Sequence, residues 1–89
     1  MLVDISEIQI VPVKPKEGLV AFASFVLDDK LYLGSIAIIT RSEGGYRLLY
    51  PSKKIGISHN INFFYPINKP FAKAIEAAVI KKFEEVRFV

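Results

Sequence analysis

The sequence predicts an α+β domain: a mostly antiparallel, five-stranded β-sheet with one carboxy-terminal α-helix packed on one face. Runs of β-branched and aromatic residues, broken by Gly, Pro, Asp and Asn, fill most of the chain before residue 68. Apolar residues recur at helical spacing only after that position. Because 89 residues can bury one modest core, we expect a single domain over residues 1–89.

The first expected strand runs from Val3 to Val13. Its apolar residues change phase near Ser6 and Glu7, which predicts a β-bulge there. Pro12 and Pro15 should end this strand, and they favour an edge position or a loop because proline cannot donate to a ladder.

The next two expected strands are Leu19 to Leu27 and Leu31 to Thr40, joined by the short polar connection Asp28-Asp29-Lys30, which suits a hairpin. Both strands are apolar on both faces, so a sheet built from them must be covered on two sides. One helix covers one side, and we expect a partner subunit on the other. The apolar fraction of 52% points the same way, to a homodimer or a larger assembly.

The fourth expected strand is Tyr46 to Tyr50, which follows a glycine turn at Gly44-Gly45 and stops at Pro51. Lys53 to Asn62 is rich in Lys, Ser, Asn and Gly and is predicted to be a loop. A short fifth strand is expected at Phe63 to Tyr65.

The helix should begin at Asn68, a good N-cap residue, with Pro70 tolerated in the first turn. Its apolar stripe is predicted to contain Phe71, Ala74, Ile75, Ala78, Val79, Phe83 and Val86. Ile80 falls opposite Phe71 on a helical wheel and is expected to be exposed. It is either an oligomer contact or a single apolar residue on the surface.

Several classes of protein are disfavoured by the composition. The chain has no cysteine, which excludes disulfides and sulfur metal sites and fits a cytoplasmic protein. Its amino terminus lacks the features of a signal peptide. The longest nearly apolar run, Leu31 to Ile39, is far shorter than the roughly 20 residues that span a bilayer, so we expect no membrane association.

Little in the chain suggests catalysis. Ser58, His59 and Asn60 are adjacent in a polar segment, where successive side chains diverge and cannot act together as a catalytic triad. Asp28-Asp29 is typical of a turn rather than of a cation site, and Gly44-Gly45 lacks any phosphate-loop pattern. We therefore expect no enzyme activity, no metal or other cofactor and no small-molecule substrate.

Charge is distributed unevenly along the chain. Gly44 to Ile75 contains five basic residues and no Asp or Glu, whereas the remainder has seven basic and nine acidic residues. The formal charge of +3 is therefore about +5 on one segment and about −2 elsewhere. A one-sided basic surface is typical of proteins that bind phosphate backbones, although lysines in polar segments are also common on ordinary solvated surfaces.

The basic residues suggest a phosphate site. Lys69 and Lys73 are four residues apart and share one side of the helix start, whose amino terminus itself favours an anion. The aromatic residues of this region either stack on bases or belong to a core or an interface: Tyr46, Tyr50, Phe64 and Tyr65. The predicted nucleic-acid contacts are Lys53, Lys54, Lys69, Lys73, Arg47, Ser52 and Asn68.

An ordered set of short motifs covers nearly the whole chain. Its members are Ala21-Phe22-Ala23-Ser24, Leu27-Asp28-Asp29, Gly45, Pro51-Ser52-Lys53 and Pro66-Ile67-Asn68 at the opening of the helix. In this order they resemble the stage V sporulation protein G (SpoVG) family over roughly residues 8–86. The chain departs from the family pattern at Tyr65, where His is usual, and at Tyr50, where Met is usual.

The resemblance implies a small bacterial dimer with an antiparallel sheet and a carboxy-terminal helix, which binds DNA or RNA as a regulator linked to septation and sporulation. The family's basic residue after Pro-Ser corresponds to Lys53, and its basic helix start corresponds to Lys69 and Lys73. The alternative is a protein-interaction adaptor of the division machinery that uses an exposed strand edge or the Ile80 side of the helix.

Overall fold

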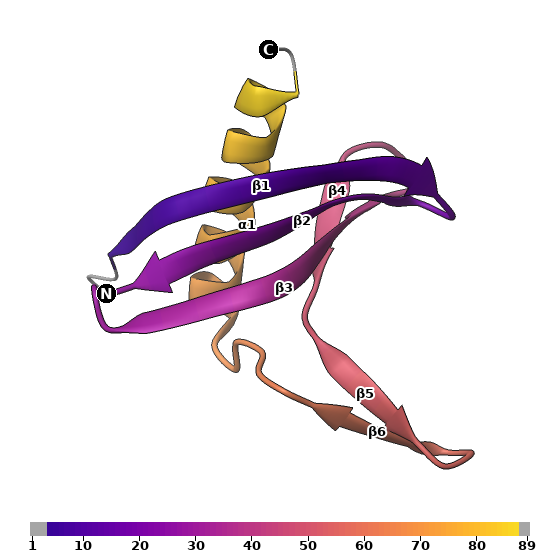
Figure 1. Cartoon of the computed structure of the whole chain (residues 1–89). Helices are drawn as coiled ribbons and strands as arrows, with labels where there is room; N and C mark the ends of the chain where they lie inside the picture. The colour runs from indigo at the N-terminus through magenta and orange to yellow at the C-terminus, as the bar shows by residue number, and fades with distance from the viewer. Residues whose placement is uncertain (1–3, 88–89) are drawn as a thin grey trace.

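Figure 1 shows the computed structural model, which describes residues 4–87 of the chain as six strands followed by one helix. The elements are β1 (Ile5–Lys16), β2 (Leu19–Leu27), β3 (Leu31–Thr40), β4 (Tyr46–Leu49), β5 (Ser52–Ile55), β6 (His59–Asn62) and α1 (Lys69–Val86). The predicted α+β class and the single carboxy-terminal helix are confirmed for this part of the chain.

The strands form two separate antiparallel sheets instead of the one five-stranded sheet that we predicted. The larger sheet has four strands in the order β1-β2-β3-β4, and the smaller one contains only β5 and β6. β4 is short and pairs with β3 from Ala37 to Thr40. Pro51 follows it and cannot donate a backbone hydrogen bond, so the chain leaves the sheet there and β5 pairs with β6 instead.

The hydrophobic core lies between the four-stranded sheet and α1, which crosses behind the strands in Figure 1. β2 and β3 contribute alternate residues, as expected for strands with one face against a helix. The fully or nearly buried core residues are Ala21, Ala23, Phe25, Ile36, Ile38, Ile75, Val79 and Phe83. Tyr46 closes one end of the core, because its ring meets that of Phe83 edge to face at 5.0 Å.

The first strand confirms the predicted bulge and corrects the predicted end. The β1–β2 register shifts between Ser6 and Gln9, and Glu7 has a positive φ of 49°. β1 then continues through Pro12 and Pro15 instead of ending there. It is an edge strand, where an N–H missing from the outer side removes no ladder bond. The predicted start at Val3 lies outside the described residues.

β2 and β3 have the predicted bounds and form the predicted hairpin. Asp28 and Asp29 adopt positive φ values of 53° and 55° in the connection, a conformation that aspartate tolerates better than most residues. The Asp28 carboxylate also accepts a hydrogen bond from the Asp4 backbone N–H at 2.9 Å. Both acids therefore serve the turn, as the sequence predicts.

The segment from Lys53 to Asn62 forms the β5–β6 hairpin, not the loop that we predicted. Lys53 pairs with Ile61, Lys54 with Asn60 and Ile55 with His59. Gly56, at a φ of +69°, permits the tight turn. Polar side chains suggested a loop, but the ladder is made by backbone groups, which do not depend on side-chain polarity.

The segment after β6 is irregular, so the strand predicted at Phe63 to Tyr65 is wrong. The Phe63 N–H donates to the Pro51 carbonyl and closes the base of the hairpin. The Phe64 ring then packs against Tyr50 at 6.0 Å. This segment is held by one hydrogen bond and by ring packing, without a strand partner.

The helix begins as predicted. The Asn68 side chain accepts a hydrogen bond from the Phe71 N–H at 2.9 Å, and Pro70 lies in the first turn. The prediction for Ile80 is wrong, since this residue is partly buried. The buried stripe is centred on Ile75, Val79 and Phe83 rather than on Phe71, so Ile80 lies beside the stripe and not opposite it.

The other face of the four-stranded sheet, here called the open face, has no layer over it in the described chain. Figure 1 shows α1 only behind the strands. Val11, Phe22 and Tyr32 are exposed on the open face, and Ser24 between them is nearly buried by its neighbours. The sequence predicted that both faces of the sheet are covered. Within residues 4–87 only one face is covered, by α1.

Candidate nucleic-acid interface

The β5–β6 hairpin projects from the body of the molecule and carries two of the predicted lysines. Figure 1 shows it extending away from the sheet and the helix, and every residue of both strands is exposed. Successive strand residues point to opposite sides. Lys53, Ile55, His59 and Ile61 therefore share one side of the hairpin, here called its apolar side.

The opposite side of the hairpin, its polar side, carries Ser52, Lys54, Asn60 and Asn62. The sequence treated Lys53 and Lys54 as one basic pair, but the ladder separates them. On the polar side one ammonium group stands among uncharged hydrogen-bonding groups, all exposed. This is the composition by which proteins hold a phosphate backbone without reading bases.

Lys69 and Lys73 are both exposed at the start of α1. They are separated by about one helical turn, or about 6 Å along the axis, and so share one side of the helix. The first turn contains no acidic residue that would neutralise them. Together they present two adjacent positive charges at one end of the molecule.

The helix amino terminus offers fewer backbone donors than the sequence suggested. Pro70 has no N–H, and the Phe71 N–H is already bound to the Asn68 side chain. The Asn68 carbonyl accepts from Ala72 as the first regular helical bond. Anion binding here would therefore depend on the lysine side chains more than on the peptide dipoles. The observed role of the Asn68 side chain is to cap the helix.

The hairpin and the helix start are linked by a short connection. Only six peptide steps separate Asn62 from Asn68, so their Cα atoms can be at most about 22 Å apart. Figure 1 shows this connection returning from β6 to the lower end of α1. The two pairs of lysines therefore lie in neighbouring parts of the structure, within the span of a short nucleic acid.

Arg47 lies elsewhere. It is exposed on β4. A row of paired residues crosses the four strands here: Arg47 pairs with Ile39, Ile39 pairs with Leu19, and Leu19 pairs with Lys16. In-register neighbours share a face, so Arg47 and Lys16 stand at the two ends of one row across the open face. Arg47 is thus separated from the helix lysines by the sheet. Sequence reasoning missed Lys16, which only the strand register brings opposite Arg47.

The aromatic residues near the basic segment are mostly structural. Tyr46 packs on Phe83, and Tyr50 packs on Phe64. Burial, with a smaller contribution from the negative charge of Glu76, raises the pKa of Tyr50 to about 12. Among the four aromatics that the sequence singled out, Tyr65 is the one classed as exposed, and the others are partly buried.

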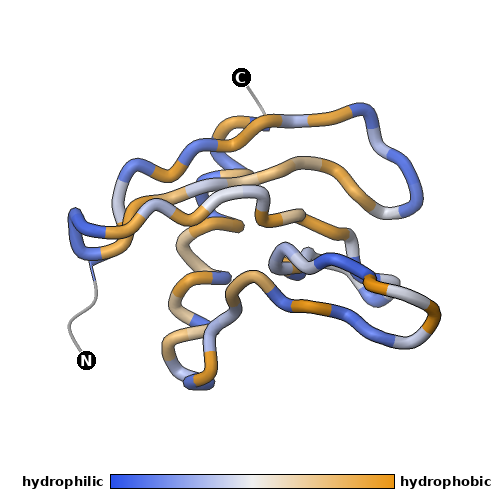
Figure 2. The backbone as a smooth tube through the Cα atoms, turned by 60° about the horizontal axis from the view of Figure 1, so that its bottom comes forward, coloured by the Kyte–Doolittle hydropathy of each residue, from blue (hydrophilic) through white to orange (hydrophobic). Residues whose placement is uncertain are grey.

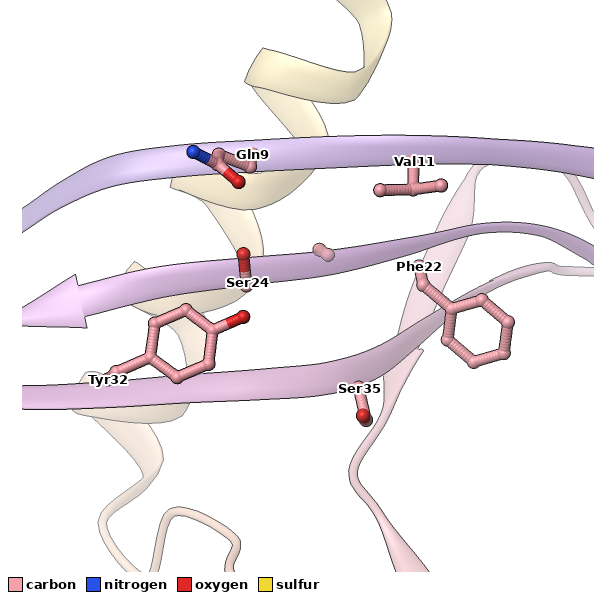
Figure 3. Close-up of a pocket in the computed structure, with 7 residues that line it drawn as sticks. Gln9, Val11, Phe22, Ser24, Tyr32 and Ser35 are labelled. Carbon is pink, nitrogen blue, oxygen red and sulfur yellow. The ribbon is translucent and has the colours of Figure 1, made fainter.

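Two aromatic rings that sequence reasoning did not select are exposed on the open face. Phe22 and Tyr32 line a shallow pocket there together with Val11 and with three polar residues, Gln9, Ser24 and Ser35 (Figure 3). The alternation of apolar residues in β2 and β3 was visible in the sequence. The sequence did not indicate which of the two faces α1 would leave open.

The residues that the sequence considered for catalysis do not come together in the structure. Ser58 lies in the turn, and His59 and Asn60 follow in β6 with side chains on opposite sides. Between residues 4 and 87 no three His, Asp or Glu side chains gather closely enough to hold a metal ion. A helix long and apolar enough to cross a membrane is likewise not found in that range.

The chain matches the SpoVG family model over residues 3–85. It is similar to a Finegoldia magna protein named "Putative septation protein SpoVG", with 33% identity over 81 residues, covering 91% of this chain and 74% of that protein. A protein of the same name from Treponema denticola is 28% identical over 82 residues, covering 92% and 87%. One from Borrelia hermsii is 26% identical over 69 residues, covering 78% and 71%.

Proposed function

This chain belongs to the SpoVG family, and from that premise we propose that it is a small, non-enzymatic bacterial regulator that binds DNA or RNA in the cytoplasm. It holds phosphate backbones through the β5–β6 hairpin and the start of α1. Three relatives are named as septation proteins, which supports a role in septation for this chain. The family resemblance adds sporulation and gene expression to the processes that we propose it regulates.

The observation that carries this proposal is the exposure of a basic segment without any acidic residue. Lys53 and Lys54 stand on a hairpin whose strands are exposed at every residue, and Lys69 and Lys73 are exposed at the helix start. Since no carboxylate occurs between Gly44 and Ile75, these ammonium groups have no acidic neighbour within the segment. They remain available to phosphate oxygens.

The proposal has a quantitative consequence for salt dependence. Four lysine contacts per subunit would neutralise about eight phosphates in a dimer. Each neutralised phosphate releases bound counterions, so the affinity should fall by roughly 10³-fold or more between low and moderate salt. An affinity that does not change with salt concentration would rule out this mechanism.

The test is a fluorescence-anisotropy titration against a duplex DNA and a single-stranded RNA at two salt concentrations. The variant Lys53→Glu/Lys73→Glu should lose the salt-sensitive binding, because each substitution replaces attraction to phosphate by repulsion. A matched control is Lys30→Glu/Lys81→Glu, which makes the same change in net charge at two exposed lysines outside the basic segment. Equal losses in both variants would mean that net charge alone matters and would contradict the assigned site.

We propose a homodimer that is held by the isoleucines on the apolar side of the hairpin, with Lys53, near the base of that side, keeping its ammonium group in water at the rim of the contact. Ile55 and Ile61 are half exposed there, and Ile57 at the turn is 95% exposed. Figure 2 shows hydrophobic and hydrophilic residues alternating along this arm. A lone two-stranded hairpin is at best marginally stable in water, so burial of its apolar side against a second copy would stabilise it.

Light scattering tests the dimer. A subunit of 10.0 kDa gives a particle of about 20 kDa for two copies (2 × 10.0 kDa) at micromolar concentration. The variant Ile55→Ser/Ile61→Ser should shift it towards the monomer, whereas Ile67→Ser, which removes an exposed isoleucine outside the hairpin, should not. A monomeric wild-type protein would contradict the dimer and leave the nucleic-acid proposal standing.

A second function, a protein-interaction adaptor of the division machinery, is favoured by one strand edge. Within residues 4–87, β4 pairs with β3 only from Ala37 onward, so the β3 edge from Leu31 to Ile36 faces no strand on that side. Such an edge can accept an added strand from a partner. Charge reversal at Lys53 and Lys73 would abolish nucleic-acid binding and spare the adaptor function.

A further inference from the structure

The open face of the sheet carries two exposed aromatic rings. Tyr32, near the start of β3, is 69% exposed, and Phe22, within β2, is 38% exposed. Figure 3 shows the Tyr32 ring nearly face-on in the space between β3 and β2, with its hydroxyl group near Ser24. Exposed apolar side chains that gather on one face are typical of an interaction site.

The rings border a pocket of about 330 Å³ that also has polar walls. Gln9 of β1 and Ser24 of β2 are in-register partners, and Ser35 of β3 lines the same hollow. An amide and two hydroxyl groups can both donate and accept hydrogen bonds. Such a mixture suits the edge of a planar, polar ring better than the apolar side chains of a second protein.

Positive charge borders the same face. Lys16 and Arg47 are the terminal members of one row of residues across the four strands, and both are exposed. Their backbones are about 14 Å apart, from three strand spacings. An anion that runs over this face would meet one of these cations on either side of the apolar middle of the row, which Leu19 and Ile39 form.

The orientation of the Tyr32 ring depends on Gly34. A Cβ atom at position 34 would lie 2.9 Å from both Cε2 and the hydroxyl oxygen of Tyr32. Real Cβ atoms essentially never come this close to another heavy atom, so a side chain at position 34 would displace the ring. The absence of a side chain at Gly34 is therefore what lets the Tyr32 ring extend along its own strand as far as position 34.

From these observations we propose that the open face binds bases of single-stranded nucleic acid. The rings of Tyr32 and Phe22 stack on the bases, and Lys16 and Arg47 hold the phosphates. The edge of a base forms hydrogen bonds with the side chains of Gln9, Ser24 and Ser35. A four-stranded sheet with aromatic residues on its outer face is the arrangement by which RNA-recognition motifs stack bases. This inference rests on the proposed nucleic-acid function and adds a second surface to it.

The two surfaces should take different substrates. Stacking needs unpaired bases, so the open face takes single strands and leaves a duplex unbound. The lysines of the hairpin and the helix start contact only the backbone and can hold either form. Substitutions on the open face should therefore change single-strand affinity and leave duplex affinity unaltered.

The experiment measures anisotropy with a labelled single-stranded RNA of about 12 nucleotides and with a duplex DNA of similar length, using the full chain. Tyr32→Leu should weaken RNA binding by roughly 5- to 100-fold, the range expected for loss of one base stack, and leave duplex binding unaltered. Tyr32→Phe should retain most of the affinity. Tyr65→Leu is the matched control, because it removes an exposed tyrosine that lies off the open face.

Gly34→Ala is a second variant that keeps both rings. It should displace the Tyr32 ring and weaken RNA binding in the same direction, with an unfolding curve close to that of the wild type, since the atoms it meets are at the end of a flexible side chain. Lys16→Gln/Arg47→Gln should lower the slope of log affinity against log salt for RNA only. Lys30→Gln/Lys81→Gln is the control for that charge change.

Three results would overturn the inference, and they also separate it from the proposed function. If Tyr32→Leu leaves RNA binding intact and Lys53→Glu/Lys73→Glu abolishes it, the open face is not the site and the backbone function stands. If Tyr32→Leu converts a dimer to a monomer without altering RNA affinity, the open face belongs to a second copy. If the wild type binds neither RNA nor duplex at low salt, both proposals fail together.

Discussion

The body of the molecule and its projecting hairpin are built from the same kind of strand but differ in what stabilises them. In β2 and β3 alternate residues are buried against α1, and the core contains Phe25, Ile36 and Ile38 with no exposed surface. In β5 and β6 every residue is exposed, and the ladder of backbone hydrogen bonds is the main contact. The stability of the fold therefore comes mainly from the body, and the side chains of the hairpin are available to contact a partner.

The hairpin also differs from the body in charge. Its strands carry Lys53 and Lys54 and no acidic residue, whereas the exposed surface of α1 beyond its first turns carries both signs, including Glu84, Glu85 and Lys81. Mixed charge is typical of a surface that only needs to stay in water, and charge of one sign favours a charged partner. The comparison thus separates a folding unit from a candidate binding arm.

The largest effect is expected in the core. Phe25→Ala removes a fully buried ring from the centre of the sheet and should lower the free energy of unfolding by about 3–5 kcal/mol, a large part of the stability of a small domain. Chemical denaturation measures it. A loss below about 1 kcal/mol would mean that the packing around β2 does not determine stability.

The second effect concerns the link between the two regions and depends on pH. The pKa of Tyr50 is raised from 10.0 to about 12, so this group favours the folded state fully below pH 10 and loses that contribution between pH 10 and 12. Two pKa units correspond to at most about 2.7 kcal/mol, and partial solvation lowers this. In Tyr50→Phe the alkaline loss of stability, followed by thermal melting, should be smaller than in the wild type. Identical alkaline profiles would contradict the shift.

The third effect is at the helix start, where the two functions of Asn68 can be separated. Asn68→Ala removes the hydrogen bond to the Phe71 N–H and should destabilise the fold by about 1 kcal/mol. Asn68→Ser, which can still accept that bond, should restore most of the stability. If Asn68→Ala weakens nucleic-acid binding and Asn68→Ser restores it as well, capping rather than contact explains this residue.

The smallest effect is expected at the tip of the hairpin. Ile57 is 95% exposed, so Ile57→Ser should change the free energy of unfolding by no more than about 0.5 kcal/mol in dilute solution, where a dimer is dissociated. Denaturation at two protein concentrations checks this. A large loss in the dilute sample would show that the hairpin stabilises the body of its own chain, and the contrast between the two regions would fail.

Much of the fold could be predicted from local patterns. The alternation in β2 and β3 and the Asp28-Asp29 connection fixed a hairpin with the bounds that the structure has. Asn68, with Pro70 behind it, marked the helix start, because capping involves atoms within one turn. The phase change near Ser6 marked the bulge for the same reason. Alternate residues of a strand share a face, and a bulge shifts that alternation by one residue.

The candidate site was predicted less completely. Lys69 and Lys73 share one side of α1, as helical spacing requires. Lys53 and Lys54 were taken together because they are adjacent, but once they belong to a strand they face opposite sides. Arg47 was grouped with them by sequence distance, and the β3–β4 register puts it on the open face across from Lys16.

The sequence by itself determined the α+β class, the strand and helix signals that depend on neighbours in the chain, and the segregation of charge into residues 44–75. Tertiary structure decided which strands pair, since Ser52 to Asn62 pairs with itself rather than extending the sheet. It also decided which sheet face is open, because β2 is apolar on both faces and only the docking of α1 distinguishes them. Periodicity and capping act over a few residues, whereas pairing and coverage depend on contacts between distant segments, which no local pattern encodes.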